Sequence, residues 1–373
     1  MVDKSMMVAA PDDFFAAGFR PELLTSRMSS GSSGVPFTSY FDAERIARHR
    51  AQLVGGYRAL GADPFGSFVH CRPWVHATRR DRFSYALRGQ HLYAGEKDDE
   101  SIRAVARWMT RRSRTTIMGL SSFLETLLRG FERLEISFPP GTVGLVLGVG
   151  EPASRYLTEA VPRLFGIALT MRYSNTENGI LGFTNGSSPQ YALDTSTFHV
   201  EILEQDSDRP ARPGALGRIV VTDLYNRAMP FLRYDTGDLG RFAVDRDGVA
   251  VPSRLAELAG RSSDVAIAGT VDAPVRAGYF QLFMRIDDAA GLRQFQLRQR
   301  AIGHFTWVLD ADPSPELEHR IRQVLDEEVG DILSCEFRYV RPGELASEGK
   351  RRFFVSEIPD PERLLEISRR GPR

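Results

Sequence analysis

Two short segments of this sequence combine small residues with oxygen-bearing side chains in a way that suits phosphate. Residues 29–34 read Ser-Ser-Gly-Ser-Ser-Gly, so backbone N–H groups can converge on an anion while the serine hydroxyls add donors. No Gly-Lys-Ser/Thr ending of the Walker A type follows. In residues 173–179, Thr176 and Glu177 supply oxygens suited to a phosphate-bound Mg2+, and Tyr173 offers a ring for stacking an adenine. A Ser/Gly linker and a solvated Asx turn are the plain alternatives.

Three further polar positions are candidates for binding ribose, phosphate or a carboxylate. In residues 233–239, Asp238 follows a glycine turn, and its carboxylate can accept both hydroxyls of a ribose. Arg261 lies in a small-residue segment at an apparent domain boundary and can contact phosphate or ribose. Lys350 ends a Gly-bounded loop and is one of only three lysines among 48 Lys and Arg residues, so it invites a functional explanation. A hairpin turn and a surface lysine remain the alternatives.

The elements expected ahead of and around these motifs are typical of a parallel α/β sheet. Apolar residues recur at helical spacing over residues 42–60 and 100–109. The apolar run 142–149 predicts a buried strand, residues 154–165 a helix and residues 168–173 a second strand. Ligands of such sheets bind at the carboxyl ends of the strands, where the motifs of the preceding paragraphs begin.

The second half of the chain changes character. Residues 191–251 are rich in strand patterns, with a hairpin turn expected at 245–248. A compact unit follows, in which Ser314-Pro315 predicts the start of an amphipathic helix. The sequence therefore predicts an α/β protein with a large N-terminal domain, residues 1–264, and a small α+β C-terminal domain, residues 265–373.

The overall composition excludes several classes of protein. The 373 residues carry 48 Lys and Arg against 48 Asp and Glu, so neither nucleic acid nor an anionic membrane is expected as a partner. Apolar residues make up 42%, as in ordinary globular proteins. Cys71 and Cys335 lie far apart and predict no disulfide framework or zinc cluster, which fits a reducing cytoplasm. We find no signal-type segment and no apolar run of membrane-spanning length.

The order of the motifs resembles that of the adenylate-forming superfamily, which comprises acyl-CoA synthetases, nonribosomal adenylation domains and luciferases. Within it the sequence most resembles the phenylacetate-CoA ligase and coenzyme F390 synthetase branch. That resemblance rests on Gly-Val-Gly-Glu-Pro at 148–152, Pro-Phe-Leu-Arg-Tyr-Asp-Thr-Gly-Asp at 230–238 and Ser-Glu-Gly-Lys at 347–350. It covers roughly residues 27–356 and extends to short forms from aromatic natural-product pathways, including those of phenazine antibiotics.

The resemblance implies a large ATP-binding domain, a small C-terminal lid, and a role for each motif. Residues 29–34 would hold the β- and γ-phosphates, residues 150–152 would border the adenine, and Asp238 would bind the ribose. The implied nucleotide-binding residues are Ser29, Ser30, Gly31, Ser32, Ser33, Gly34, Gly150, Glu151, Pro152, Tyr173, Asn175, Asp238 and Arg261.

The catalytic residues implied by the resemblance are Thr176, Glu177 and Lys350. Thr176 would contact the α-phosphate, Glu177 would hold Mg2+, and Lys350 would bridge the substrate carboxylate and the α-phosphate. ATP and Mg2+ are the implied cofactors. Positioning and charge neutralisation then suffice for adenylation, because a carboxylate is already a nucleophile.

The acid would lie between the stretch 65–74 and the strand ends near Gly150 and Tyr173. His70, Trp74 and His76 are candidate walls, and an aromatic lining favours a flat aryl acid, although each could equally belong to the core. The acceptor of the acyl group stays open among CoA, an amine and a carrier protein, and so does the oligomeric state.

Three departures from the family pattern leave two alternatives open. Val35 stands where many relatives carry lysine, the sequence after Gly269 lacks the usual Asn-Val-Phe-Pro type continuation, and the phosphate loop begins earlier than in longer relatives. CoA transfer is therefore left open. A catalytically retired nucleotide-binding homologue is one alternative. An acyl-protein synthetase that uses a protein cysteine is the other, with Cys335 the only cysteine of the second domain.

Overall fold

The chain forms two compact units. One comprises Met1–Ala153 and Leu157–Leu258, and the other Ser154–Tyr156 and Ala259–Arg373. The predicted boundary at residue 264 lies outside the residues that the structure describes. This computed structural model describes residues 1–28, 37–72, 89–93, 98–186, 188–261, 265–269, 274–278, 286, 292–328, 333–341, 344–345 and 354–358.

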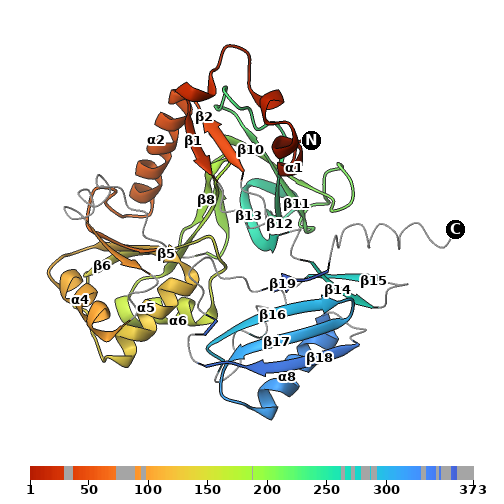
Figure 1. The fold of residues 1–373 in the computed structure, drawn as a ribbon. Helices are drawn as coiled ribbons and strands as arrows, with labels where there is room; N and C mark the ends of the chain where they lie inside the picture. Colours follow the sequence, from red (N-terminus) through yellow and green to blue (C-terminus); the bar gives the residue numbers. More distant parts are fainter. Residues whose placement is uncertain are drawn as a thin grey trace. The chain divides into compact units, whose positions relative to one another are not determined.

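The larger unit is built around one mixed sheet. Its described strands are β3 (Phe68–Arg72), β4 (Gly89–Tyr93), β5 (Thr115–Leu120), β6 (Val143–Val149), β7 (Leu169–Asn175), β8 (Gly179–Thr184), β9 (Tyr191–Leu193), β10 (Phe198–Leu203), β11 (Gly217–Asp223), β12 (Tyr234–Val244) and β13 (Ala250–Arg261). They form an 11-stranded sheet in the order β10-β11-β12-β13-β9-β8-β7-β6-β5-β3-β4 (Figure 1).

In the parallel half of this sheet, the order in which the chain adds strands reverses at one point. Strands β4, β3, β5, β6 and β7 pair in parallel. From β3 the chain moves outward to β4, whereas from β5 it moves the opposite way to β6 and β7. Such a reversal opens a crevice at the carboxyl ends of the two strands, here β3 and β5, where doubly wound proteins bind their ligands. The predicted succession of strand, helix and strand is confirmed in β6, α6 (Arg155–Phe165) and β7.

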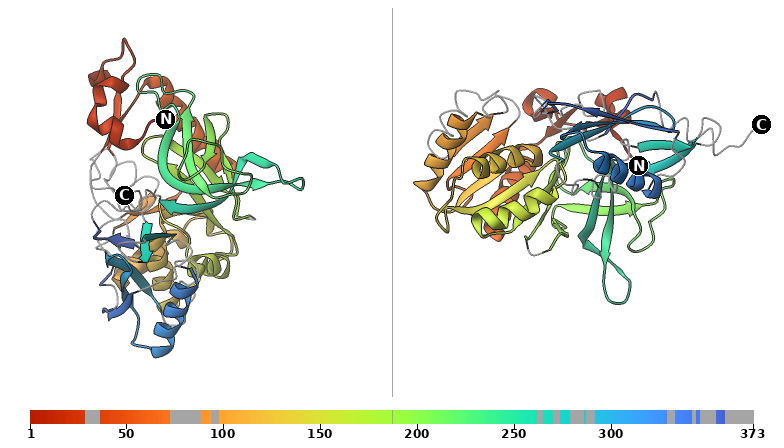
Figure 2. Two further views of the ribbon diagram at one scale, coloured as in Figure 1. Left: turned by 90° about the vertical axis from the view of Figure 1, so that its right-hand side faces the viewer. Right: turned by 90° about the horizontal axis from the view of Figure 1, so that it is seen from below.

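Helices cover both faces of the parallel strands. Leu145 and Leu147 of β6 pack with Tyr57 of α2 (Ala43–Ala59), which covers one face. The opposite face is covered by α5 (Ser121–Arg133), which packs on β3, β5 and β6 and beside α4 (Asp99–Thr110) (Figures 1 and 2). Burial on both faces explains why β6 is apolar throughout. The predicted helices α2 and α4 are confirmed, whereas α5 was not predicted.

The antiparallel half of the sheet has a core of its own. Leu181, Phe198, Val200, Ile219 and Val221 are among the buried residues that form it. The predicted turn at 245–248 joins β12 to β13, with Gly248 at a φ of 77° that favours glycine. This hairpin projects from the sheet (Figure 2).

The N-terminal segment packs against the strand that carries Asp238. It contains α1 (Lys4–Ala9), two short 3-10 helices (Pro11–Phe14 and Pro21–Leu23) and the antiparallel pair β1 (Thr25–Met28) and β2 (Thr38–Phe41). Val2 forms an isolated bridge with Tyr234, and Met7 is buried with Phe231 and Tyr234. The segment therefore supports the start of β12.

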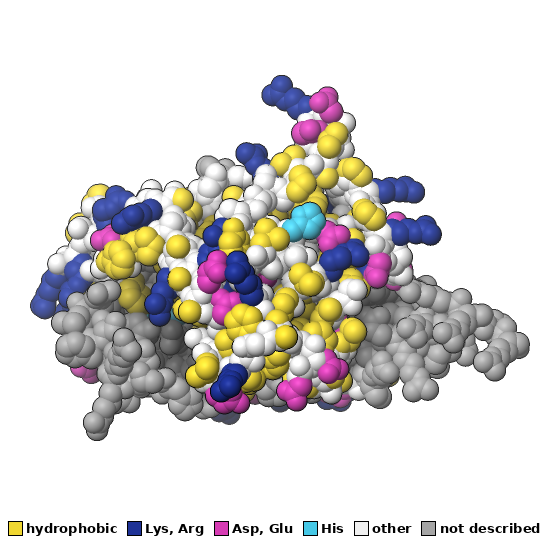
Figure 3. Space-filling model, turned by 90° about the horizontal axis from the view of Figure 1, so that it is seen from above, with side chains coloured by type: hydrophobic (Ala, Val, Ile, Leu, Met, Phe, Trp, Pro, Cys, Tyr) yellow, Lys and Arg dark blue, Asp and Glu magenta, His cyan; other side chains and the backbone are white. Residues whose placement is uncertain are grey.

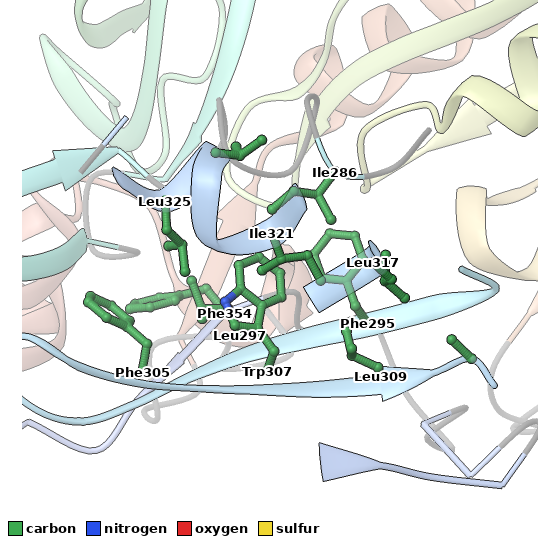
Figure 4. Close-up of a cluster of buried hydrophobic side chains, with 12 residues drawn as sticks. Ile286, Phe295, Leu297, Phe305, Trp307, Leu309, Leu317, Ile321, Leu325 and Phe354 are labelled. Carbon is green, nitrogen blue, oxygen red and sulfur yellow. The ribbon is translucent and has the colours of Figure 1, made fainter. Parts of the chain in front are cut away.

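The second unit is a small α+β unit, as predicted. It contains the hairpin β14 (Val265–Gly269) and β15 (Pro274–Gly278), and a four-stranded sheet in the order β18-β17-β16-β19. Its elements are β16 (Gln294–Ala301), β17 (His304–Asp310), α8 (Pro315–Glu328), β18 (Ser334–Tyr339) and β19 (Phe354–Ser356). Helix α8 lays Leu317, Ile321 and Leu325 over Trp307 and Phe295 of the sheet (Figure 4). The Ser314 Oγ accepts a hydrogen bond from Leu317 N at 3.3 Å, which confirms the predicted N-cap.

One face of the molecule shows how charged side chains are distributed over the described residues. Basic and acidic side chains are interspersed on the face seen in Figure 3. Among the helices of the described residues, none is both long enough and apolar enough to cross a membrane.

Candidate functional site

Two of the predicted nucleotide-binding residues are in direct contact. Tyr173 lies near the carboxyl end of β7, and its hydroxyl donates a hydrogen bond to Asp238 Oδ2 of β12 at 2.8 Å. The Tyr173 ring is 4% exposed and meets the Tyr191 ring edge-on, with 6.3 Å between centroids. The sequence predicted the two residues for adenine and ribose separately, and the structure brings them together.

A bulge in β12 presents Asp238. Arg218 of β11 pairs with Leu239 of β12, and Val220 pairs with Asp235. The stretch of β12 between these two pairs is therefore longer than the matching stretch of β11, which makes it a bulge. Gly237 has a φ of 72° and donates its N–H to Asp235 Oδ1 at 2.9 Å. Asp235 is itself held by Arg218 Nη1 at 2.7 Å. The Asp-Thr-Gly-Asp motif is therefore a fixed turn inside a strand, and bulges of this kind re-aim a side chain next to a site.

The turn after β7 carries Thr176 and Glu177. Asn178 N donates to Asn175 Oδ1 at 2.7 Å, which closes the turn with an Asx-type hydrogen bond. Arg45 of α2 donates from Nη2 to the carbonyl of Asn178. The Glu177 side chain is 6% exposed and makes no hydrogen bond or ion pair with another described residue. A carboxylate without a partner among the described residues can bind a cation.

The segment after β6 is fixed by a carboxylate at a helix end. Glu151 is 7% exposed, and its Oε2 accepts a hydrogen bond from Ser122 N at 2.8 Å, in the first turn of α5. Ser121 Oγ donates to the Glu151 carbonyl at 3.2 Å. An anion at a helix N-terminus is stabilised by the unpaired N–H groups and the helix dipole. Glu151 thus fixes Gly150 and Pro152 against α5, and the contact of this segment with adenine stays a prediction.

The remaining predicted site residues are only partly described. His70 lies half-buried in the middle of β3 and its ring lies near that of Phe68, with 6.3 Å between centroids. The backbone of Arg261 ends β13. Outside the described residues lie Ser29, Ser30, Gly31, Ser32, Ser33, Gly34, Trp74, His76 and Lys350.

One face of the parallel strands gathers residues that sequence reasoning missed. His70 pairs with Met118 of β5, Met118 with Leu147 of β6, and on the next row Val149 of β6 with Arg172 of β7. Paired residues of neighbouring strands point to the same face, and residues two apart in a strand do so as well. We call this the α2 face, because Tyr57 of α2 packs on it. Tyr173, next to Arg172, points to the opposite face.

Arg172 is accompanied on the α2 face by the imidazole of His49 and the guanidinium group of Arg27. His49 of α2 has its Nε2 3.4 Å from Nη1 of Arg27 in β1, and its Nδ1 is buried without a hydrogen bond to a described residue. Burial, with the charges of Arg27, Arg45 and Arg172, lowers the pKa of His49 to about 4. Burial lowers the pKa of Arg172 as well. An arginine within the strand of residues 169–175 is the sequence signal that could have identified Arg172.

Comparison with known proteins shows which fold the chain shares. No family model matches the chain. Over 241 residues the chain is 27% identical to the phenylacetate-coenzyme A ligase of Thermus thermophilus, covering 59% of this chain and 50% of that protein. The structure resembles 2-hydroxyisobutyryl-CoA ligase in complex with 2-HIB-AMP with a TM-score of 0.69 at 15% identity, covering 99% of this chain and 82% of that one. The chain has the adenylate-forming ligase fold.

Two further solved structures share this adenylate-forming fold. The anthranilate CoA ligase AuaEII with anthranoyl-AMP matches with a TM-score of 0.59 at 13% identity, covering 87% of this chain and 65% of that one. ATP-bound MatB of Rhodopseudomonas palustris matches with a TM-score of 0.58 at 16% identity, covering 84% and 63%. The fold and the partial sequence likeness to a phenylacetate-coenzyme A ligase agree with the predicted resemblance. The chain spans about half the length of the curated relative it matches.

The described residues bear on two earlier questions, namely how Mg2+ would be held and whether Cys335 could accept the acyl group. Among the described residues, no three His, Cys, Asp or Glu side chains are grouped to hold a metal ion. A single carboxylate such as Glu177 suits Mg2+, which is usually held by one or two carboxylates together with substrate phosphates. Cys335 of β18 is half-buried, and burial raises its pKa to about 11. Little thiolate is then present near neutral pH, which disfavours Cys335 as an acyl acceptor.

Proposed function

We propose that the protein activates a small, aromatic carboxylic acid with ATP as its acyl-adenylate. The observation that carries the proposal is the hydrogen bond between Tyr173 and Asp238, because it joins two nucleotide motifs beside the turn that bears Thr176 and Glu177. This group of residues lies at the carboxyl end of β7, the edge of a parallel sheet where ligands bind. The adenylate-forming fold and the motif order support the same reading.

The proposed reaction needs little acid–base chemistry from the chain. An ionised carboxylate oxygen attacks the α-phosphorus of ATP and forms a C–O–P anhydride. The bond between the α-phosphorus and the oxygen that bridges it to the β-phosphate breaks, and pyrophosphate leaves. The carboxylate carries no proton at neutral pH, so no general base is required. Bound Mg2+ would neutralise charge on the phosphates. The protein contributes orientation, exclusion of water and fixed donors.

The residues divide this work between them in the proposal. Asp238, oriented by Tyr173, would accept the ribose hydroxyls, while Thr176 would donate to the α-phosphate and Glu177 would hold Mg2+. Residues 29–34 would supply N–H and hydroxyl donors to the β- and γ-phosphates. Lys350 would neutralise charge between the carboxylate and the α-phosphate, and Arg261 would contact ribose or phosphate.

The proposed acceptor of the acyl group is CoA. The relatives that support this choice are a phenylacetate-coenzyme A ligase and structures of CoA ligases, among them 2-hydroxyisobutyryl-CoA ligase crystallised with 2-HIB-AMP and CoA. An amine or a carrier protein in a natural-product pathway, as in short family members, is the alternative acceptor. Trapping of the adenylate with each acceptor and mass spectrometry of the product would separate them.

Carboxylate-dependent exchange of labelled pyrophosphate into ATP tests the proposed adenylation. Aryl and alkyl acids would be scanned with the wild type, Lys350→Ala and Glu177→Gln. We expect exchange with aryl acids, a loss of at least about 100-fold in Lys350→Ala, and a raised Mg2+ requirement in Glu177→Gln. Lys4→Ala, which removes another of the three lysines, serves as the matched control.

Absence of exchange with every acid, in folded protein that binds ATP, would sink the proposal. The retired nucleotide-binding homologue would then be the better description. Exchange that persists unchanged in Lys350→Ala would instead remove Lys350 from the reaction while leaving adenylation in place.

A further inference from the structure

The α2 face holds cationic groups with no acidic partner among the described residues. Arg172 donates from Nε to Ser174 Oγ at 3.2 Å and lies 3.8 Å from the Met118 sulfur through Nη1, and no described carboxylate pairs with it. Arg27 contacts His49 and lies over the Phe41 ring, with 5.2 Å from Cζ to the centroid. Arg45, by contrast, is neutralised by Asp223 at 2.5 Å. Among the described residues, no carboxylate therefore compensates the guanidinium groups of Arg27 and Arg172.

Arg27 and Arg172 are half-buried, and withdrawing an unpaired charge even partly from water is unfavourable, so these two charges need an explanation. A counter-charge supplied by a ligand would offset this cost. The pKa of His49 is lowered by burial and then by these arginines, so the imidazole is neutral near pH 7 and adds no charge. Its buried Nδ1 still lacks a hydrogen-bond partner among the described residues. Both features are met by an anionic ligand.

Arg172 lies on a different face of the sheet from Tyr173 and Asp238, the residues proposed to bind the nucleoside. Tyr173 and Asp238 meet on the opposite side of β7, since neighbouring residues of a strand point to opposite faces. The α2 face instead carries His70, the predicted wall of the acid site, three strands away from Arg172. Three strand spacings amount to about 14 Å, which spans a small aromatic acid together with the side chains that hold it.

The surroundings of Arg172 suit an organic anion better than a polyphosphate. Tyr57, Met118, Val149 and Phe183 pack with the buried leucines of β6 on this face. Sites for organic acids combine such apolar surface with a few convergent polar groups, whereas phosphates are cradled by successive backbone N–H groups and hydroxyls.

We propose that the acid activated by this protein carries a second anionic group, and that Arg172, assisted by Arg27 and His49, binds that group. This inference rests on the proposed adenylation and specifies its substrate class as aromatic dicarboxylic acids and their close analogues. Arg172 is a specificity residue in this scheme, because it binds the part of the substrate that does not react.

Matched acids test the inference through pyrophosphate exchange. Benzoate and isophthalate differ only in the second carboxylate, and 3-sulfobenzoate replaces it by another anion. We expect the wild type to favour isophthalate over benzoate in kcat/KM by about 10- to 100-fold, the range for hydrogen bonds to a charged group. In Arg172→Met this ratio should fall to about 1, with benzoate little affected and the affinity for AMP unchanged.

A stability measurement separates binding from a structural role. Methionine replaces the guanidinium by apolar volume, so removal of an uncompensated charge should leave the melting temperature of Arg172→Met unchanged or raised. A structural guanidinium would lower it. Arg163→Gln, which removes an arginine paired with Glu132 on the surface, is the matched control for both readouts.

The possible outcomes each decide something. A wild type that favours benzoate, or an isophthalate preference unchanged in Arg172→Met, overturns the inference while adenylation stands. Loss of tripolyphosphate binding in Arg172→Met, without a change of acid preference, assigns the cations to ATP and also overturns it. Should no acid support exchange, the proposed adenylation fails, and calorimetry of isophthalate against benzoate on the same protein decides the inference alone.

Discussion

The hydroxyl of Tyr173 donates a hydrogen bond to Asp238 Oδ2 at 2.8 Å, across 65 residues of sequence. Their strands β7 and β12 are not neighbours in the sheet, since β8, β9 and β13 lie between them. The contact therefore depends on the curvature of the antiparallel half and on the bulge that re-aims Asp238. It couples the motif that precedes Thr176 and Glu177 to the motif assigned to ribose.

We expect Asp238→Asn to weaken binding of AMP by about 10- to 100-fold, because a neutral amide accepts hydroxyl hydrogen bonds less strongly than a carboxylate. Tyr173→Phe should weaken it less and lower the free energy of unfolding by about 1 kcal/mol. Calorimetric titration with AMP and urea denaturation measure the two effects. Asp247→Asn in the β12–β13 turn is the control, and equal AMP affinity in Asp238→Asn and the wild type would remove Asp238 from the ribose site.

Removal of the Glu151 carboxylate should destabilise the large unit. Glu151→Ala deletes the acceptor of Ser122 N at the start of α5, and loss of a helix cap costs about 1–2 kcal/mol. Glu151→Gln retains an acceptor and should cost about half as much. Urea denaturation measures both, and a Glu151→Ala protein as stable as the wild type would show that the cap is energetically unimportant.

The ion pair of Arg45 with Asp223 should be strongly coupled. Arg45 and Asp223 are 1% and 0% exposed in their side chains, with 2.5 Å between Nε and Oδ2. Arg45→Met leaves a buried carboxylate uncompensated and should cost about 3–5 kcal/mol. Arg45→Met with Asp223→Asn should cost less than the sum of the two single changes, because the orphaned charge is removed. A double-mutant cycle by denaturation measures this, and additive costs would contradict a coupled pair.

Arg45 also bears on the site through its contact with the carbonyl of Asn178. Arg45→Met should therefore disturb the turn that carries Thr176 and Glu177. Reduced pyrophosphate exchange in protein that is still folded would show this effect. Arg48→Met is the control, because Arg48 lies on the same helix as Arg45 and stacks on the ring of Tyr225.

Stability should fall in mildly acidic solution because of His49. Its pKa is about 4 in the folded protein, against 6.5 in the unfolded chain, through burial and the charges of Arg27 on β1, Arg45 on α2 and Arg172 on β7. Between these values the unfolded state binds more protons, so the His49 contribution is present above pH 6.5 and is lost as the pH falls toward 4. Denaturation at pH 7 and pH 4.5 should show a smaller loss for His49→Gln than for the wild type. An identical loss in both would place the acid sensitivity elsewhere.

An anion bound on the α2 face should oppose this effect. A negative charge near His49 favours its protonated form, so isophthalate should raise the pKa of His49. NMR of the imidazole protons measures this pKa. Benzoate should raise it less. An unchanged His49 titration at saturating isophthalate would place the second carboxylate away from this residue.

Much of the secondary structure was determined locally and could be predicted from the sequence. Apolar runs and alternation gave β6 and β10, Asp42 and Ser314 marked helix starts, and Asp245 to Gly248 marked a hairpin, because each pattern acts within a few residues of chain. The order of the motifs also indicated the family. Helix α5 was not predicted although apolar residues recur along it at helical spacing. Only the structure shows the N-terminal segment pairing with β12.

The tertiary structure alone decided which residues share a site. Arg27, His49 and Arg172 come from three distant segments, and no local pattern reports that β1, α2 and β7 bring their side chains together. The sequence predicts Glu151 as a nucleotide contact, and only the structure shows that its carboxylate also caps α5. Local periodicity and turn chemistry are properties of neighbouring residues, whereas the meeting of distant charges depends on strand order, register and burial, which the whole chain sets together.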